Sequence, residues 1–210
     1  MSASWPELKR GIVAILRGLE PHEAKAVGRA VFEAGIEAIE VPLNSPEPFR
    51  SIETIIDDLP ETALVGAGTV LTVADVDRLA DAGGKLLVAP NVDAAVLARA
   101  AELSIVTMPG VFTPTEAFAA IKAQASALKF FPASVLGPKG IAAIGAVLPK
   151  GFVVGVVGGV SEADFADYAK IGVRTFGLGS SLYKPGMSAA DVGGRAKAAV
   201  AAWDRVFAEG

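Results

Sequence analysis

The stretch I-V-A-I-L-R-G-L-E-P-H-E-A-K-A-V-G-R-A-V-F-E-A-G-I-E-A-I-E-V-P-L (residues 12–43) has two β-branched runs on either side of an alanine-rich segment. Such runs are typical of buried strands. Between them, apolar side chains recur at spacings of three and four from Ala24 to Ala34, which is the period of one helix face. Gly35 then stands where a left-handed helix end favours glycine. The stretch predicts a complete strand–helix–strand unit.

The same alternation continues along the chain. Capping boxes at residues 113–116 (T-P-T-E) and 161–164 (S-E-A-D) mark two helix starts, and Gly83 and Gly172 follow helical runs as glycines that end helices do. About 22 residues per unit leave only short connections. Eight strands are expected, at residues 12–17, 38–43, 63–70, 86–91, 104–109, 127–132, 152–159 and 174–180.

Alternating strand–helix units build either a closed (β/α)8 TIM barrel or an open doubly wound sheet. Eight units favour the closed barrel. An open dinucleotide-binding sheet would carry G-x-G-x-x-G after its first strand, whereas residues 16–20 read L-R-G-L-E. We therefore expect an α/β fold with one barrel domain over residues 1–210. The segment W-P-E-L-K-R (5–10) is expected to form a short extra helix across one end of the barrel.

Composition limits the possible partners. With 210 residues, 52% of them hydrophobic, the chain can bury one large core. A net charge of -4 offers no basic surface for nucleic acid or acidic lipid. The absence of cysteine excludes disulfides and thiolate metal sites and fits a reducing compartment. No segment has the apolar length of a signal peptide or a membrane span, so we expect a cytoplasmic protein.

The run A-L-K-F-F-P (127–132) places a lysine among apolar residues. Burying an unpaired charge is costly, so Lys129 is expected to be partnered, deprotonated or used in chemistry. The alternative is a strand-end lysine whose ammonium group reaches water. Because alternate strand residues face the interior of a barrel, Lys129 and Phe131 should point inward while Leu128 faces the helices.

The same alternation places Glu40 inside the barrel on the second strand. Arg17 ends the first strand and Thr69 ends the third, so both should lie at the active-site end. A confined lysine and glutamate suit imine chemistry, in which the amine attacks a ketone and the carboxylate moves protons. An inert ion pair that only fills the interior is the alternative reading of Lys129 and Glu40.

Glycine-rich strand ends predict a phosphate site. V-V-G-G-V-S (156–161) and G-L-G-S-S (177–181) end the last two strands, and the loops at these places often bind phosphate in such barrels. Tight turns alone would also explain these glycines. The candidate donors are Gly158, Gly159, Gly179, Ser180 and Ser181.

Metal and triad chemistry find few candidate residues. His22 is the only histidine, and it stands at a helix start where a solvated side chain is expected. A zinc site therefore lacks its usual ligands, and a serine triad would have to use His22. Glu40 could join a carboxylate-only magnesium site. We expect no metal and no other cofactor.

The motifs A-I-L-R-G, E-V-P-L-N-S-P, G-A-G-T-V-L, L-K-F-F-P, V-G-G-V and G-L-G-S-S-L-Y span nearly the whole chain. Together they resemble the Schiff-base 2-keto-3-deoxy-6-phosphosugar aldolases. The resemblance implies a metal-independent class I aldolase, a homotrimer of barrels, that releases pyruvate and D-glyceraldehyde 3-phosphate. It implies that Lys129 forms the imine and Glu40 transfers protons. The expected substrate contacts are Arg17, Thr69, Pro90, Phe131 and Val157.

Two departures bear on the sugar. Family members that act on the gluconate epimer typically have E-V-T-L-R-T and P-T-G-G where this chain has Asn44 and Val157. Both differences favour 2-dehydro-3-deoxy-6-phospho-D-galactonate as the substrate. Cleavage of the gluconate epimer, or of both epimers, stays open. A phosphosugar isomerase or epimerase and a non-catalytic phosphosugar-binding protein are further alternatives, since the fold alone does not decide function.

Overall fold

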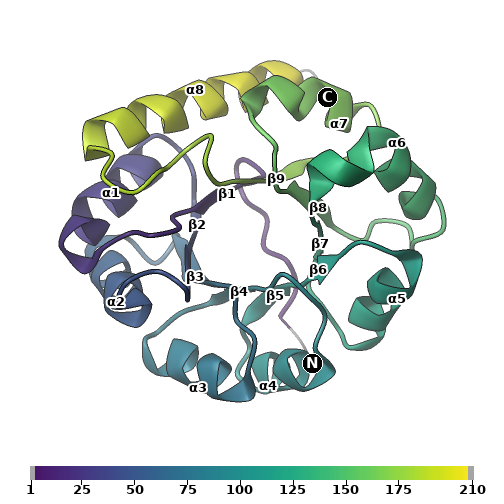
Figure 1. The fold of residues 1–210 in the computed structure, drawn as a ribbon, viewed down its shortest axis with the longest axis horizontal. Helices are drawn as coiled ribbons and strands as arrows, with labels where there is room; N and C mark the ends of the chain where they lie inside the picture. The colour runs from purple at the N-terminus through teal and green to yellow at the C-terminus, as the bar shows by residue number, and fades with distance from the viewer. Residues whose placement is uncertain (1–2, 208–210) are drawn as a thin grey trace.

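Nine parallel strands form a barrel surrounded by helices in the computed structural model, which describes residues 3–207 (Figure 1). The expected (β/α)8 barrel is confirmed. The strands are β1 Ile12–Ile15, β2 Ala38–Pro42, β3 Leu64–Gly68, β4 Leu86–Val88, β5 Val106–Met108, β6 Gly110–Val111, β7 Leu128–Phe130, β8 Val154–Val157 and β9 Thr175–Leu178. The helices are α1 Pro21–Glu33, α2 Pro48–Asp58, α3 Val73–Asp81, α4 Ala94–Glu102, α5 Pro114–Lys122, α6 Ala133–Gly145, α7 Phe165–Ala169 and α8 Ala189–Phe207, with a 3-10 turn η1 at Glu162–Asp164.

The expected fifth strand ends at Pro109, whereas in the structure β5 stops before this proline and β6 continues the same position after it. β5 pairs with β4 and β6 pairs with β7, so the two short strands together occupy one position and close the ring. Proline has no N–H to donate, which interrupts a ladder of hydrogen bonds. The carbonyl of Pro109 still accepts the Lys129 N–H at 3.0 Å. The nine strands therefore amount to the eight expected positions.

Both predicted capping boxes are present. The amide of Glu116 donates to Thr113, and the Glu116 carboxylate accepts the Thr113 N–H at 2.8 Å, at the start of α5. Ser161 and Asp164 form the second box, which begins η1 and leads into α7. Gly35 has a φ of 103°, the left-handed conformation expected after α1.

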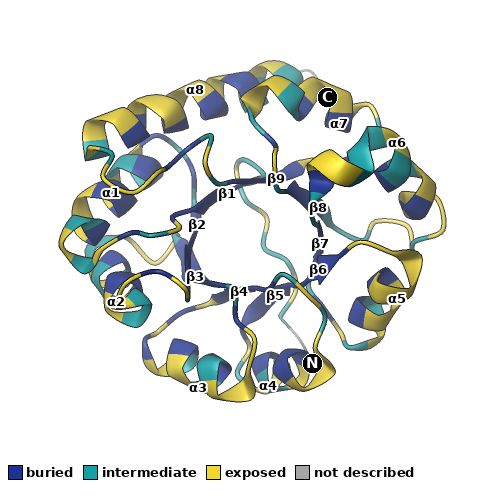
Figure 2. Ribbon diagram, in the orientation of Figure 1, coloured by how far each residue is buried: buried dark blue, intermediate teal, exposed yellow. Residues whose placement is uncertain are grey.

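The apolar core has two layers. Outward-facing strand residues such as Ile39 and Phe130 pack with the buried faces of the helices. Inward-facing residues such as Val13, Leu64 and Val106 form a second cluster at the N-terminal end of the barrel. Figure 2 shows buried strands inside helices whose outer faces are exposed. No helix within residues 3–207 is both long enough and apolar enough to span a membrane.

The prediction of an extra helix at residues 5–10 is wrong. The segment has no helical structure, although it does cross one end of the barrel (Figure 1). Trp5 and Leu8 pack against the inner apolar cluster, and the amide of Lys9 donates to Glu37 at 2.8 Å. A helix this short gains few hydrogen bonds for the cost of its first turn, so contacts with the barrel determine the conformation.

Candidate active site

Lys129 lies in the middle of β7 and points into the barrel. Its side chain is buried, with 6% of the residue exposed, while Leu128 packs in the outer layer. Gly110 and Gly155, which have no side chains, are its partners on the neighbouring strands. The Lys129 ammonium nitrogen lies 4.8 Å from the centre of the Phe131 ring. The predicted alternation on this strand is confirmed.

Glu40 points into the same interior from β2 and is 1% exposed. Gly68 on β3 leaves room for its carboxylate, because a Cβ there would lie 1.7 Å from Glu40 Oε2. Glu40 Oε2 is buried and has no hydrogen-bond partner within the described chain. Burial raises the pKa of Glu40 to about 7, and the positive charges of Lys129 and Arg17 oppose this shift. Glu40 therefore has an acceptor that is free to receive a proton.

Lys129 and Glu40 influence each other without a direct ion pair. Burial lowers the pKa of Lys129, Glu40 opposes this shift, and the charge of Arg17 adds to it. The ion pairs among residues 3–207, defined by N–O distances up to 4.0 Å, do not include these two side chains. A lowered lysine pKa favours the neutral amine, which is the nucleophilic form.

Arg17 and Thr69 lie at the C-terminal ends of β1 and β3. The Arg17 side chain is exposed, and its Nη1 donates to Oδ1 of Asn44 in the loop after β2. Thr69 is partly buried and has a φ of 57°, a left-handed conformation that non-glycine residues rarely adopt. Such backbone strain often lies at functional sites. Both residues are at the predicted end of the barrel.

Three further expected contacts lie at or near the same end. The Phe131 ring packs on Gly158, since a Cβ at Gly158 would lie 3.0 Å from the ring. Val157 is buried, and a Cβ on neighbouring Gly177 would lie 2.6 Å from it. Pro90 follows β4 and is partly buried. Phe131 is thus beside Lys129, while Val157 and Pro90 contribute apolar walls from other strands.

The loops after β8 and β9 are adjacent. Gly158 and Gly159 have φ values of 92° and 71°, so two consecutive residues are left-handed. The Ser181 hydroxyl donates to the carbonyl of Val160 at 3.2 Å, which joins the two loops. Consecutive backbone N–H groups in such loops form concave anion sites. These loops carry the expected contacts Gly158, Gly159, Gly179 and Ser180.

The model of the KDPG and KHG aldolase family matches residues 7–202. The chain belongs to this family. A relative from Rhizobium meliloti (strain 1021), described as a probable 2-dehydro-3-deoxy-6-phosphogalactonate aldolase, is 64% identical over 202 residues, or 96% of this chain and 95% of the relative. The predicted family resemblance is confirmed, and the chain is an aldolase, a carbon–carbon lyase.

Two solved structures share the fold of this aldolase closely. One, described as a native KDPGal structure, has a TM-score of 0.94 at 43% identity and covers 98% of this chain and 99% of the other. The second is a cube-shaped, highly porous protein cage designed by fusing symmetric oligomeric domains. It has a TM-score of 0.93 at 44% identity and covers 96% of this chain and 74% of the cage chain.

Ser134 is a residue at the site of the aldolase that the sequence interpretation missed. Its amide donates to the carbonyl of Gly158 at 3.0 Å, and its hydroxyl oxygen would lie 2.6 Å from a Cβ on Gly159. Its place just after F-F-P-A, at the start of the helix that follows the lysine strand, was the available indication. Ser134 thus brings a hydroxyl to the glycine loop after β8.

The remaining candidate chemistry is not assembled in the described part of the aldolase. His22 is at the surface as expected, with 73% of its side chain exposed and Nδ1 3.3 Å from Glu20. Within residues 3–207, no group of three or more His, Cys, Asp or Glu side chains is placed to hold a metal ion. The magnesium alternative at Glu40 therefore finds no set of protein ligands among these residues.

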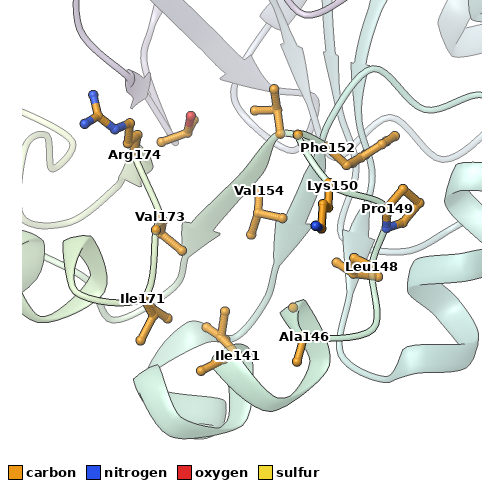
Figure 3. Close-up of a pocket in the computed structure, with 16 residues that line it drawn as sticks. Ile141, Ala146, Leu148, Pro149, Lys150, Phe152, Val154, Ile171, Val173 and Arg174 are labelled. Atoms are coloured by element: carbon orange, nitrogen blue, oxygen red, sulfur yellow. The ribbon is translucent and has the colours of Figure 1, made fainter.

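A cavity of about 670 Å³ lies elsewhere in the aldolase (Figure 3). It is at the N-terminal ends of β8 and β9, where Val154, Val173 and Arg174 lie, and beside the C-terminal part of α6. Its lining is mainly apolar, from residues such as Leu148 and Ile171. Lys129 and the glycine loops face the opposite end of the barrel, so this cavity is separate from the candidate site.

Proposed function

We propose that the chain is a Schiff-base aldolase that cleaves 2-dehydro-3-deoxy-6-phospho-D-galactonate to pyruvate and D-glyceraldehyde 3-phosphate. One observation carries the proposal. The interior of the barrel holds both Lys129, a buried lysine with a lowered pKa, and Glu40, a buried glutamate whose Oε2 has no hydrogen-bond partner within the described chain. The names of the relatives, together with Asn44 and Val157, support the galactonate sugar.

Imine formation uses Lys129 and Glu40 in turn. The neutral amine of Lys129 attacks the C2 ketone of the substrate to give a carbinolamine. Glu40, as the carboxylic acid, donates a proton to the leaving hydroxyl, and water departs to leave the iminium and the Glu40 carboxylate. A pKa of about 7 allows Glu40 to act as an acid in this step and as a base in the next.

Carbon–carbon cleavage follows from the iminium. Glu40, now the carboxylate, accepts the proton of the C4 hydroxyl, and the C3–C4 electron pair moves toward the iminium nitrogen. Glyceraldehyde 3-phosphate leaves and an enamine remains on Lys129. Protonation of the enamine at C3 and hydrolysis of the resulting imine release pyruvate and restore the amine.

The other residues bind the two ends of the substrate. Arg17 and Thr69 would receive the carboxylate at the pyruvyl end, because they lie at the mouth near Glu40 and Lys129. Arg17 influences both of these groups electrostatically, which supports this assignment. Pro90, Phe131 and Val157 would shape the walls. The phosphate would be bound by Gly158, Gly159, Gly179 and Ser180.

We also propose a homotrimer that works in the cytoplasm. The cage built from symmetric oligomeric domains supports self-association of this type of barrel. Exposed apolar side chains are available for a subunit contact at Leu71 and Val73, next to β3, and at Phe112 and Phe118, near α5. The lack of cysteine fits a reducing compartment. Sedimentation equilibrium would give the subunit number, and a monomer would contradict the trimer.

Borohydride trapping tests the imine mechanism. The protein is incubated with pyruvate and borohydride, and the modified peptide is located by mass spectrometry. We expect modification of Lys129 and none in Lys129→Met, which should also release no pyruvate in an assay coupled to lactate dehydrogenase. Turnover by Lys129→Met would instead favour an isomerase or epimerase. Ligand binding with no pyruvate release by the wild type would favour a binding protein.

The sugar preference is tested separately. Values of kcat/KM are measured side by side for the galactonate and gluconate epimers. A higher value for the galactonate epimer is expected, and a higher value for the gluconate epimer would contradict the proposed substrate while leaving the imine mechanism intact.

A further inference from the structure

Two hydrogen bonds join the loop after β1 to the loop after β2. Arg17 Nη1 donates to Asn44 Oδ1, and the amide of the next residue, Gly18, donates to the hydroxyl of Ser45 at 2.9 Å. Both bonds span 27 residues of sequence, so the two loops run side by side in register. Ser45 is buried, with 8% exposed, and fixes the backbone below the contact. Asn44 and Arg17 stand above it at the surface.

The chemistry of this contact leaves Arg17 able to bind an anion. A guanidinium group has five N–H donors in a planar fork, and its long side chain otherwise has many rotamers. The amide oxygen of Asn44 occupies part of that fork and restricts its orientation. Because an amide carries no charge, the positive charge of Arg17 is not neutralised, as it would be by a carboxylate.

The contact is placed beside the reacting groups. Arg17 follows β1, whose residue Ile15 is paired with Glu40 on β2, and Asn44 lies four residues after Glu40. The charge of Arg17 acts on both Glu40 and Lys129. An anion bound to Arg17 would therefore lie at the end of the barrel where β1 and β2 carry Arg17 and Asn44, above Glu40.

We infer that Asn44 is a positioning residue that orients Arg17 to bind the carboxylate next to the reacting ketone. This inference rests on the proposed function, since it assumes a 2-keto acid bound at Lys129. Asn44 acts through Arg17 and needs no contact with the substrate. It thereby contributes to the choice of a 2-keto acid over a ketone without a carboxylate.

The test measures pyruvate affinity through the concentration dependence of borohydride trapping at Lys129. Asn44→Ala is expected to raise the half-saturating pyruvate concentration about tenfold, in line with the loss of one hydrogen bond to a charged group. The trapping rate at saturating pyruvate should stay close to that of the wild type. With hydroxyacetone, which has no carboxylate, the substitution should have no effect. An equal effect on both ketones would overturn the inference.

A double-mutant cycle separates positioning from a direct or structural role. In the Arg17→Ala background, adding Asn44→Ala should change pyruvate affinity no further, because the residue acts only through the guanidinium. Additive losses would show that Asn44 contributes independently and would overturn the inference. Circular dichroism and thermal unfolding confirm that each variant is folded.

Asn44→Asp distinguishes electrostatics from simple loop support. Aspartate keeps the acceptor, so a purely structural role would be rescued with wild-type affinity. If Arg17 binds a carboxylate, the added negative charge should weaken pyruvate binding more than Asn44→Ala does, and increasing salt should reduce the difference. Failure of the wild type to be trapped at Lys129 would instead refute the proposed function itself, so the two failures are distinguishable.

Discussion

Gly68 on β3 provides the space that the carboxylate of Glu40 occupies, since a Cβ at Gly68 would lie 1.7 Å from Glu40 Oε2 and 2.6 Å from Oε1. The two residues are on neighbouring parallel strands, and both are buried. Position 68 must therefore be glycine because the Glu40 carboxylate lies where a side chain would begin.

Gly68→Ala should displace Glu40 and lower kcat on the order of 100-fold, the loss expected when a reacting group moves by about 1 Å. The three atoms nearest the new methyl group all belong to the end of the Glu40 side chain, so the protein should still fold. Steady-state kinetics with the phosphorylated substrate, alongside circular dichroism, would measure both properties.

Gly145→Ala is the matched control for Gly68→Ala. Gly145 ends α6, and a Cβ there would have no neighbour within 4 Å. Its activity should equal that of the wild type, with unfolding free energy raised by up to about 1 kcal/mol. Full activity in Gly68→Ala would show that the position of the Glu40 carboxylate does not limit the reaction.

Glu40 should make stability depend on pH. Its pKa is raised from 4.5 to about 7 by burial, so its contribution to stability is fully present below pH 4.5 and is lost as pH rises through 7. At about 1.4 kcal/mol per pKa unit, this loss is on the order of 3 kcal/mol. Glu40→Gln does not ionise and should be more stable than the wild type at pH 8, with little difference at pH 4.

Urea unfolding at pH 4, 6 and 8 measures this effect, with Lys129 unchanged in both proteins. The pH dependence of activity gives a second test, because Glu40 must be a carboxylate to act as the base in cleavage. The kcat/KM of the wild type, which reports the free enzyme, should fall as pH drops below about 7. A stability difference that does not vary with pH would mean that Glu40 titrates normally.

Gly159→Ala should weaken binding of the phosphorylated end of the substrate. The new Cβ would lie 2.6 Å from Ser134 Oγ, and a φ of 71° is strained for alanine. The KM for glyceraldehyde 3-phosphate in the synthesis direction should rise about tenfold or more, since one oriented N–H contact to a charged group contributes 1.5–3 kcal/mol. The KM for unphosphorylated glyceraldehyde should not change.

Gly172→Ala provides the corresponding control. Its φ of 82° is similarly strained, but a Cβ there would have no neighbour within 4 Å, and the residue precedes β9 at the far end of the barrel. It should lose similar stability without any change in KM for the phosphorylated aldehyde. If Gly159→Ala raised the KM values for both aldehydes equally, the phosphate would have to bind elsewhere.

Phe176 should be important for stability alone. It is fully buried on β9, with ring centres of Phe165 and Phe207 at 4.2 and 6.1 Å. Phe176→Ala should cost about 3–5 kcal/mol of unfolding free energy. Val147→Ala truncates a residue that is 58% exposed and should change the free energy of unfolding by no more than about 0.5 kcal/mol. Denaturant unfolding of both variants tests the difference.

Much of the barrel could be predicted because alternation and strand order follow from local sequence. The alternation of inward and outward residues along a strand predicts that Lys129 and Glu40 face the interior, and both are buried. These inferences need only the pleat of a strand and the direction of parallel strands.

The features that were missed depend on contacts between distant segments. The conformation of residues 5–10 is set by the barrel end, which local propensity does not describe. Ser134 comes to Gly159 only because the loops after β7 and β8 are neighbours. The break at Pro109 follows from proline itself. That the residues before it pair with β4 and those after it with β7 depends on closure of the ring.

The hydrogen bond from the Lys129 amide to the Pro109 carbonyl helps to join β7 to the β5–β6 position, which we call the seam of the barrel. The same bond holds the backbone of the proposed nucleophile. Opening the seam between β6 and β7 would release the backbone of Lys129 in the same event. A partly folded chain with an open ring would thus have no assembled site, and catalytic activity would report ring closure. Hydrogen exchange at the Lys129 amide should therefore follow the reversible loss of activity in denaturant.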